Sequence, residues 1–264
     1  MLNRFITAAV CLGAVCLGAI ARPTAAPAQG LTVAAASDLQ VALPAIAARF
    51  EQTTGHTVTL TFGSSGNLFT QIQNGAPFDV LLSADIDYPR RLAQAGLGEP
   101  GSLYAYATGR LVLWTRRDSG IDVRGGLSVL ADARVRRIAI ANPAHAPYGR
   151  AAVAALHHEG LYERVRAKLV FGENISQAAQ FAQSGNAEVG MLALSLARAP
   201  ALANAGASVE IPASFHPPIE QAAIVIAASA RKAIARQFIE ALKTPESARV
   251  LEAYGFGVPH AVAR

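Results

Sequence analysis

Short apolar runs rich in Val, Leu and Ile alternate along the sequence with amphipathic stretches of roughly ten to fifteen residues. This alternation is typical of βα units around a largely parallel sheet, and it predicts an α/β protein. In the stretch 38–53, apolar residues recur at helical spacing, which indicates a helix with one buried face. The first group of elements is expected as strands at 31–36, 57–62 and 78–83 and helices at 38–53, 66–74 and 88–95.

A second group of alternating elements follows a strand that begins at Arg110 with the run LVLWT. The expected strands are 137–141, 168–171 and 189–194, and the expected helices are 149–159 and 175–184. The Ala-rich segment 200–211 ends in another strand. After it we expect a returning strand at 221–228 and closing helices at 231–243 and 245–254.

Two long strands connect these groups, one leaving the first group near residue 110 and one returning near residue 224. We therefore expect two lobes with a cleft between them. Residues 29–112 and 224–264 would form the first lobe, and residues 113–223 the second. A single continuous domain remains the alternative, because about 236 residues would follow a leader of 28, and one domain can be that long.

The first 28 residues have the features of a secretory signal peptide. Arg4 provides a basic start, residues 5–20 form an apolar run, and the segment 26–28 (Ala-Pro-Ala) supplies the small residues that signal peptidase reads. The apolar run is shorter than the ~20 residues of a membrane-spanning helix. Cleavage is expected near Gln29, which predicts an exported, periplasmic protein.

Both cysteines, Cys11 and Cys16, lie inside the predicted signal peptide. Cleavage before Cys16 as a lipoprotein is the alternative, but Val15 is bulkier than the Gly or Ala usual before a lipidated cysteine. A mature chain without cysteine excludes disulfides, zinc ribbons and cysteine nucleophiles.

The composition predicts a folded protein that binds no nucleic acid. The sequence is 52% hydrophobic and 16% charged, which is too apolar for a disordered chain. Lys plus Arg exceed Asp plus Glu by 23 to 18, and the excess is spread along the chain. A nucleic-acid-binding surface would instead gather its positive charge in a stripe.

Four of the predicted strand-to-helix turns are rich in small or hydroxylic residues. They are AAASDL at 34–39, FGSSGN at 62–67, NPAHAPYG at 142–149 and FGENIS at 171–176. A helix start exposes up to four unpaired N–H groups and carries about half a positive charge, so several starts facing one cleft would bind an anion. Ser37 and Ser65 would each add a hydroxyl donor, although a serine before a helix is often only its N-cap.

None of the four turns contains Lys or Arg, and Arg150 lies just after the third. A strongly basic pocket would also attract phosphate esters and nucleic acid. The predicted ligand is therefore a small anion held by neutral donors.

A serine hydrolase is an alternative interpretation, with Ser64 or Ser65 as the nucleophile and His145 as the base. The run GSSG differs from the G-x-S-x-G elbow, because its glycines are one residue too close. The other histidines form no i, i+4 pair of metal ligands, so no metal site is expected.

The sequence from about residue 31 to residue 258 resembles the periplasmic molybdate-binding proteins of ABC uptake systems. The resemblance rests on TVAAASDL, FGSSGNL, DVLLSAD, NPAHAPYG, GENISQA, AEVGMLALS and the closing YGF, in this order and spacing. It implies a two-lobed type II periplasmic-binding-protein fold whose cleft binds molybdate, and usually tungstate, as a bare tetrahedral dianion. It also implies delivery of the anion to the membrane permease of an ABC transporter.

The same resemblance implies the ligand-binding residues. Ser37 would bind through its hydroxyl and its amide, and Ser65 matches the second serine of the family. Tyr148 follows the proline of the third turn, a position that in some members contributes only its amide. Ile175 would give its backbone N–H, and Asp38 an amide as well.

One departure from the family concerns Ala193, where some members place a tyrosine ligand. We expect the Tyr148 hydroxyl to replace that donor. The resulting prediction is a monomeric, extracytoplasmic binding protein for molybdate or tungstate, without enzymatic activity and without a cofactor. A binder of another oxyanion such as sulfate is the first alternative, and a secreted Ser/His hydrolase is the second.

Overall fold

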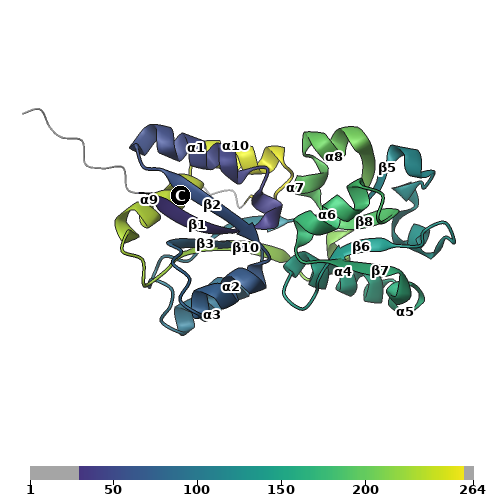
Figure 1. Ribbon diagram of the computed structural model, residues 1–264, viewed down its shortest axis with the longest axis horizontal. Helices are drawn as coiled ribbons and strands as arrows, with labels where there is room; N and C mark the ends of the chain where they lie inside the picture. Colours follow the sequence, from purple (N-terminus) through teal and green to yellow (C-terminus); the bar gives the residue numbers. More distant parts are fainter. Residues whose placement is uncertain (1–29, 259–264) are drawn as a thin grey trace, which may run out of the picture.

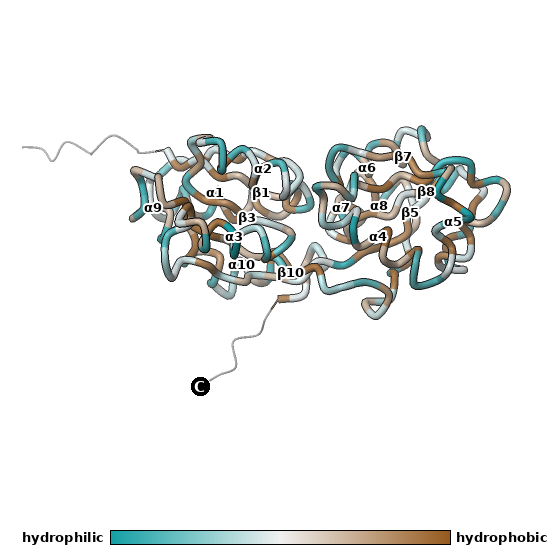
Figure 2. The backbone as a smooth tube through the Cα atoms, turned by 90° about the horizontal axis from the view of Figure 1, so that it is seen from below, coloured by the Kyte–Doolittle hydropathy of each residue, from teal (hydrophilic) through white to brown (hydrophobic). Residues whose placement is uncertain are grey.

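The computed structural model describes residues 30–258, so the predicted signal peptide lies outside the described residues. The chain forms two lobes, each built on a five-stranded sheet with helices packed against it (Figure 1). This confirms the expected two-lobed α/β architecture. In Figure 2 the two lobes lie side by side, and apolar segments run through the interior of each.

The first lobe contains the sheet β2-β1-β3-β10-β4. Strand β1 (Leu31–Ala36) pairs in parallel with β2 (Val58–Gly63) and with β3 (Val80–Ser83). Strand β10 (Ile219–Val225) is antiparallel to both β3 and β4 (Tyr104–Gly109). The sheet is therefore mixed rather than largely parallel, because the strand that returns from the other lobe enters it in the opposite direction.

Helices cover both faces of the first sheet. One face packs against α1 (Leu43–Thr54), α9 (Lys232–Leu242) and α10 (Pro245–Ala253), and the other against α2 (Ser65–Gln73) and α3 (Asp87–Gln94) (Figure 1). The buried positions of α1 are Leu43, Ile46, Ala47 and Phe50. Their helical spacing is the pattern read from the sequence, although the expected helix at 38–53 is divided here into a short 3-10 turn, Ser37–Leu39, and α1.

The second lobe contains the sheet β7-β6-β8-β5-β9. Strand β6 (Ile138–Ala141) is parallel to β7 (Leu169–Gly172) and β8 (Val189–Ala193). Strand β5 (Leu111–Arg116) is antiparallel to β8 and β9 (Gly206–Glu210). One continuous apolar core surrounds this sheet.

The helices of the second lobe include two that begin beside the cleft, α4 (Pro147–His158) and α6 (Ile175–Gln183). Three shorter ones are α5 (Tyr162–Val165), α7 (Leu194–Ala197) and α8 (Pro200–Ala205). A 3-10 segment at Val123–Ala131, which the sequence pattern did not predict, contributes Leu127 and Leu130 to the core.

The chain changes sheets at Arg110, between β4 and β5, and again between β9 and β10. The expected lobe boundaries at 112/113 and 223/224 fall inside β5 and β10, so both passages come a few residues earlier. Strand β4 was not predicted. It ends at Gly109, and a single residue, Arg110, separates it from β5.

No helix within residues 30–258 combines the length and the apolar character needed to cross a membrane.

Candidate functional site

A small pocket lies between the lobes where the four predicted turns meet. Its lining residues are Ala36, Ser37, Asp38, Gly63, Ser64, Ser65, Ala84, Ala146, Pro147, Tyr148 and Ile175. All five residues predicted as ligands are therefore brought together. The free volume is about 10 Å³, close to the space of one water molecule. The pocket is therefore narrow, and residues of both lobes line it.

The pocket forms at the carboxyl ends of parallel strands, where each chain segment turns into a helix. This is the usual place of ligand sites in α/β sheets. Ser64 is the N-cap of α2, since its side chain accepts from the Asn67 N–H at 3.4 Å. At α6, the Asn174 side chain accepts from Ser176 N–H at 3.0 Å and Gln177 N–H at 3.1 Å. These caps occupy the later N–H groups of each helix and leave the first ones directed at the pocket.

Three backbone N–H groups at these helix starts belong to Ser65, Tyr148 and Ile175. Within residues 30–258, none of them donates a hydrogen bond to another protein group. Pro147 occupies the first position of α4, so the amide of Tyr148 is the first N–H of that helix. The three donors come from α2, α4 and α6, and the positive ends of these helices favour an anion at this place.

Two serine hydroxyls complete the donor set. The Ser65 oxygen accepts from the Ala84 N–H at 2.9 Å, so its own proton remains available to a ligand. Ser37 is 3% exposed, and its hydroxyl has no hydrogen-bond partner in the described part of the chain. Neither Lys nor Arg is among the lining residues.

The Tyr148 hydroxyl points away from this donor set. It donates to Asp38 Oδ2 at 3.0 Å, and the Gln221 side chain donates to the same oxygen at 2.5 Å. Tyr106 in turn donates to Gln221 Oε1 at 2.8 Å. A phenol carries one proton, so in this arrangement the hydroxyl is engaged with Asp38, and the amide is the group of Tyr148 left free at the pocket. The expectation that the hydroxyl replaces the donor missing at Ala193 stays a prediction.

The Asp38 carboxyl group is fully buried beside the pocket. Burial raises the pKa of Asp38 from 3.8 to about 6, against the lowering effect of the hydrogen bonds from Gln221 and Tyr148. Its second oxygen, Oδ1, has no hydrogen-bond partner within residues 30–258. An ionised Asp38 would repel a bound dianion, so the site is more favourable to anions when this group is protonated.

The sequence reasoning did not identify Gln221, Tyr106 or Ser195 as residues of this region. The Ser195 hydroxyl donates to the Asp38 carbonyl at 2.8 Å and links the second lobe to the 3-10 turn of the first. The only sequence signal was a polar Gln221 within the apolar run of the returning strand.

His145 of the second lobe contacts the start of α2 in the first lobe. Its Nδ1 lies 2.8 Å from the Ser64 hydroxyl, and its carbonyl accepts from the Gly66 N–H at 2.9 Å. Glu173 lies on the far side of the ring, 3.7 Å from Nε2. The Ser/His pair considered for a hydrolase is therefore present, and Ser64 is at the same time the N-cap of α2.

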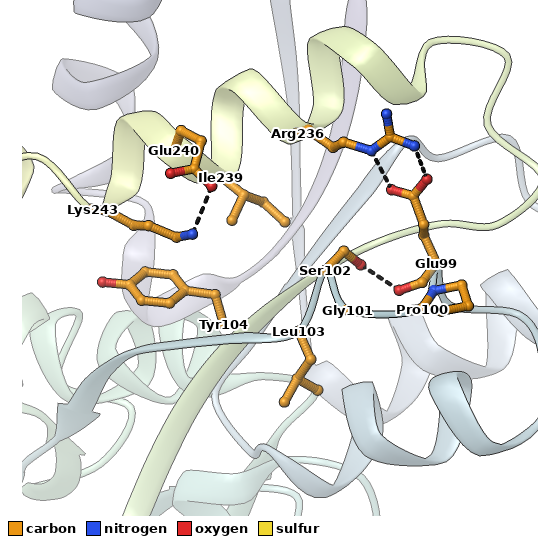
Figure 3. Close-up of a pocket in the computed structure, with 10 residues that line it drawn as sticks. All are labelled: Glu99, Pro100, Gly101, Ser102, Leu103, Tyr104, Arg236, Ile239, Glu240 and Lys243. Atoms are coloured by element: carbon orange, nitrogen blue, oxygen red, sulfur yellow. Dashed lines mark hydrogen bonds and ion pairs between the residues drawn. The ribbon is translucent and has the colours of Figure 1, made fainter.

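A separate hollow of about 160 Å³ lies on the first lobe and shares no lining residue with the pocket between the lobes. Its charged groups pair with one another (Figure 3). Arg236 forms two hydrogen bonds to Glu99, and Lys243 lies 2.6 Å from Glu240. Within residues 30–258, no cluster of three or more His, Cys, Asp or Glu side chains is arranged to hold a metal ion.

The fold and the site define a solute-binding protein with a cleft between two lobes. Residues 31–257 match the family model of bacterial extracellular solute-binding proteins, and the chain belongs to this family. The chain is 39% identical over 234 residues to molybdate-binding protein ModA of Azotobacter vinelandii, covering 89% of this chain and 92% of that protein.

Two further similarities agree with this assignment. Identity to molybdate-binding protein ModA of Rhodobacter capsulatus is 41% over 211 residues, which covers 80% of this chain and 81% of that protein. The solved structure of the Azotobacter vinelandii periplasmic molybdate-binding protein superposes with a TM-score of 0.82 at 37% identity. It covers 87% of this chain and 100% of that one.

Proposed function

We propose that this protein captures molybdate, and tungstate, between its lobes and delivers the anion to the membrane permease of an ABC transporter. The observation that carries the proposal is the meeting of three helix starts and two serine hydroxyls around one small pocket without a cation. The similarity to proteins named as molybdate-binding supports the same ligand.

In this proposal the anion oxygens accept from the hydroxyls of Ser37 and Ser65 and from the amides of Ser65, Tyr148 and Ile175. The amide of Asp38 is the remaining donor of the predicted set. These groups come from both lobes, so a bound anion joins the lobes and favours the closed form.

Selectivity follows from the fixed spacing of these donors. A smaller oxyanion such as sulfate leaves some donors unsatisfied, and each buried unsatisfied group costs about 1 to 3 kcal/mol. Molybdate and tungstate are nearly equal in size and should bind alike. We therefore expect sulfate to bind more weakly by orders of magnitude.

The proposal also includes the location and the oligomeric state of the protein. Membership of an extracellular solute-binding family supports a site of action outside the cytoplasm. Export by the predicted signal peptide, a periplasmic location and a monomeric state are the finer proposals. A transport role without catalysis is preferred to the hydrolase, for which residues 30–258 offer only the contact of Ser64 with His145.

Calorimetric titration of the chain from Gln29 onward tests the proposal directly. We expect stoichiometric binding of molybdate and tungstate and much weaker binding of sulfate, with no turnover of a chromogenic ester. Sulfate bound as tightly as molybdate would favour the first alternative. Ester turnover abolished by both Ser64→Ala and His145→Ala would favour the second.

A further inference from the structure

A second hollow lies between the lobes, next to the anion pocket, and shares the walls Ala84 and Pro147 with it. Its volume is about 290 Å³. Its other walls include Asp85 from the first lobe, Arg150 from the second and Pro217 from the returning connection. Arg150 is the only Lys or Arg among the described residues that line either of these two hollows.

The Arg150 side chain makes its contacts across the cleft. The guanidinium hydrogen-bonds to Asp85 and, at 3.2 Å, to the hydroxyl of Tyr88, and it lies 5.6 Å from the centre of the Tyr88 ring. Both partners belong to the first lobe. Within residues 30–258 it forms no side-chain hydrogen bond or ion pair with its own lobe. Separation of the lobes therefore leaves this guanidinium free and charged.

The position of Arg150 in its helix is locally unfavourable. It lies in the first turn of α4, where the helix already carries partial positive charge, so a cation there destabilises the helix. Departures from local preference of this kind occur at functional positions. On the opposite wall, Asp87 pairs with Arg90 at 3.1 Å, which leaves Asp85 as the counter-charge for Arg150.

We propose that Arg150 attracts the oxyanion into the open cleft and that Asp85 neutralises this charge when the lobes close. The inference rests on the proposed function. The anion pocket contains no cation, whereas one free guanidinium at its edge raises the local concentration of a dianion and its association rate. In the closed form the guanidinium is paired with Asp85, so neutral donors alone hold the anion, and release breaks no arginine–oxyanion pair.

Two variants that change the charge of the cleft in opposite directions distinguish attraction of the anion from stabilisation of the closed form. Arg150→Gln and Asp85→Asn both remove the ion pair across the cleft, so both should raise the molybdate dissociation rate. They change the charge of the cleft in opposite directions. Arg150→Gln should lower the association rate roughly threefold to tenfold at about 10 mM salt, and Asp85→Asn should raise it. Both effects should shrink at about 300 mM salt.

Stopped-flow mixing of the exported chain with molybdate, followed by intrinsic fluorescence, measures both rates. Arg124→Gln is the matched control, because Arg124 is an exposed arginine of the second lobe that pairs with Asp122 at 2.6 Å, lines neither hollow and should not affect association. Association rates that are unchanged, or that change in the same direction in both variants, would overturn the inference alone. A parent protein that does not bind molybdate would overturn the proposed function as well.

Discussion

Replacing Asp38 by asparagine should raise the free energy of unfolding above that of the parent at neutral pH. This gain should shrink as the pH falls. Asparagine keeps an oxygen that accepts from Tyr148 and Gln221 but cannot ionise. In the parent, burial holds the pKa of Asp38 at about 6, compared with 3.8 for an ordinary aspartate. The folded state therefore binds this proton more tightly than the unfolded state does.

The sign and size follow from proton linkage. Well below pH 3.8 the Asp38 carboxyl is protonated in both the folded and the unfolded state, so it does not lower the free energy of unfolding. As the pH rises through 3.8 and then 6, the unfolded state ionises first, and the parent loses about 3 kcal/mol of unfolding free energy in total. About 2 kcal/mol of this loss should fall between about pH 4.5 and 7.5.

Urea unfolding of parent and Asp38→Asn proteins, without ligand, at several pH values measures this difference. Asp122→Asn is a suitable control. The Arg124 side chain lowers the pKa of the exposed Asp122 to about 2, so its contribution changes only in more acidic solution. A gap between parent and Asp38→Asn proteins that stays constant from about pH 4.5 to 7.5 would refute the reasoning about Asp38.

Three further predictions concern ligand binding. Ser37→Ala and Ser65→Ala should each weaken molybdate binding roughly tenfold or more in calorimetry, the size of a hydrogen bond to a charged group; wild-type affinity in both would place the site elsewhere. Tyr148→Phe should weaken molybdate binding much less than the serine substitutions do, because the Tyr148 hydroxyl contacts Asp38 in this structure; a loss as large as theirs would mean that the hydroxyl reaches the ligand. Small-angle scattering should show a smaller radius of gyration with molybdate, and tight binding without compaction would argue for a site within one lobe.

Much of this architecture is determined by local features of the sequence. Alternating apolar runs place most strands within one or two residues of their observed bounds, because burial of one face requires that spacing. The helix starts are local as well, since Pro147 and Asn174 satisfy helix geometry through neighbours only a few positions away. For this reason the turns with Ser37 and Ser65 could be predicted to line one pocket, whereas Ile175 was expected from the resemblance to the family.

Only the tertiary structure decided which groups meet across the cleft. Asp38 and Tyr148 are 110 positions apart, and Asp38 and Gln221 are 183 apart. No local pattern encodes such contacts, because they depend on the relative placement of the two sheets. Tyr148 illustrates the difference. The sequence predicted this residue at the site, but only the folded structure shows that its hydroxyl contacts the buried carboxyl of Asp38 and leaves its amide at the pocket. The pairing of Arg150 with Asp85 likewise depends on the relative placement of the lobes. The mixed strand directions arise because the chain passes twice between the lobes.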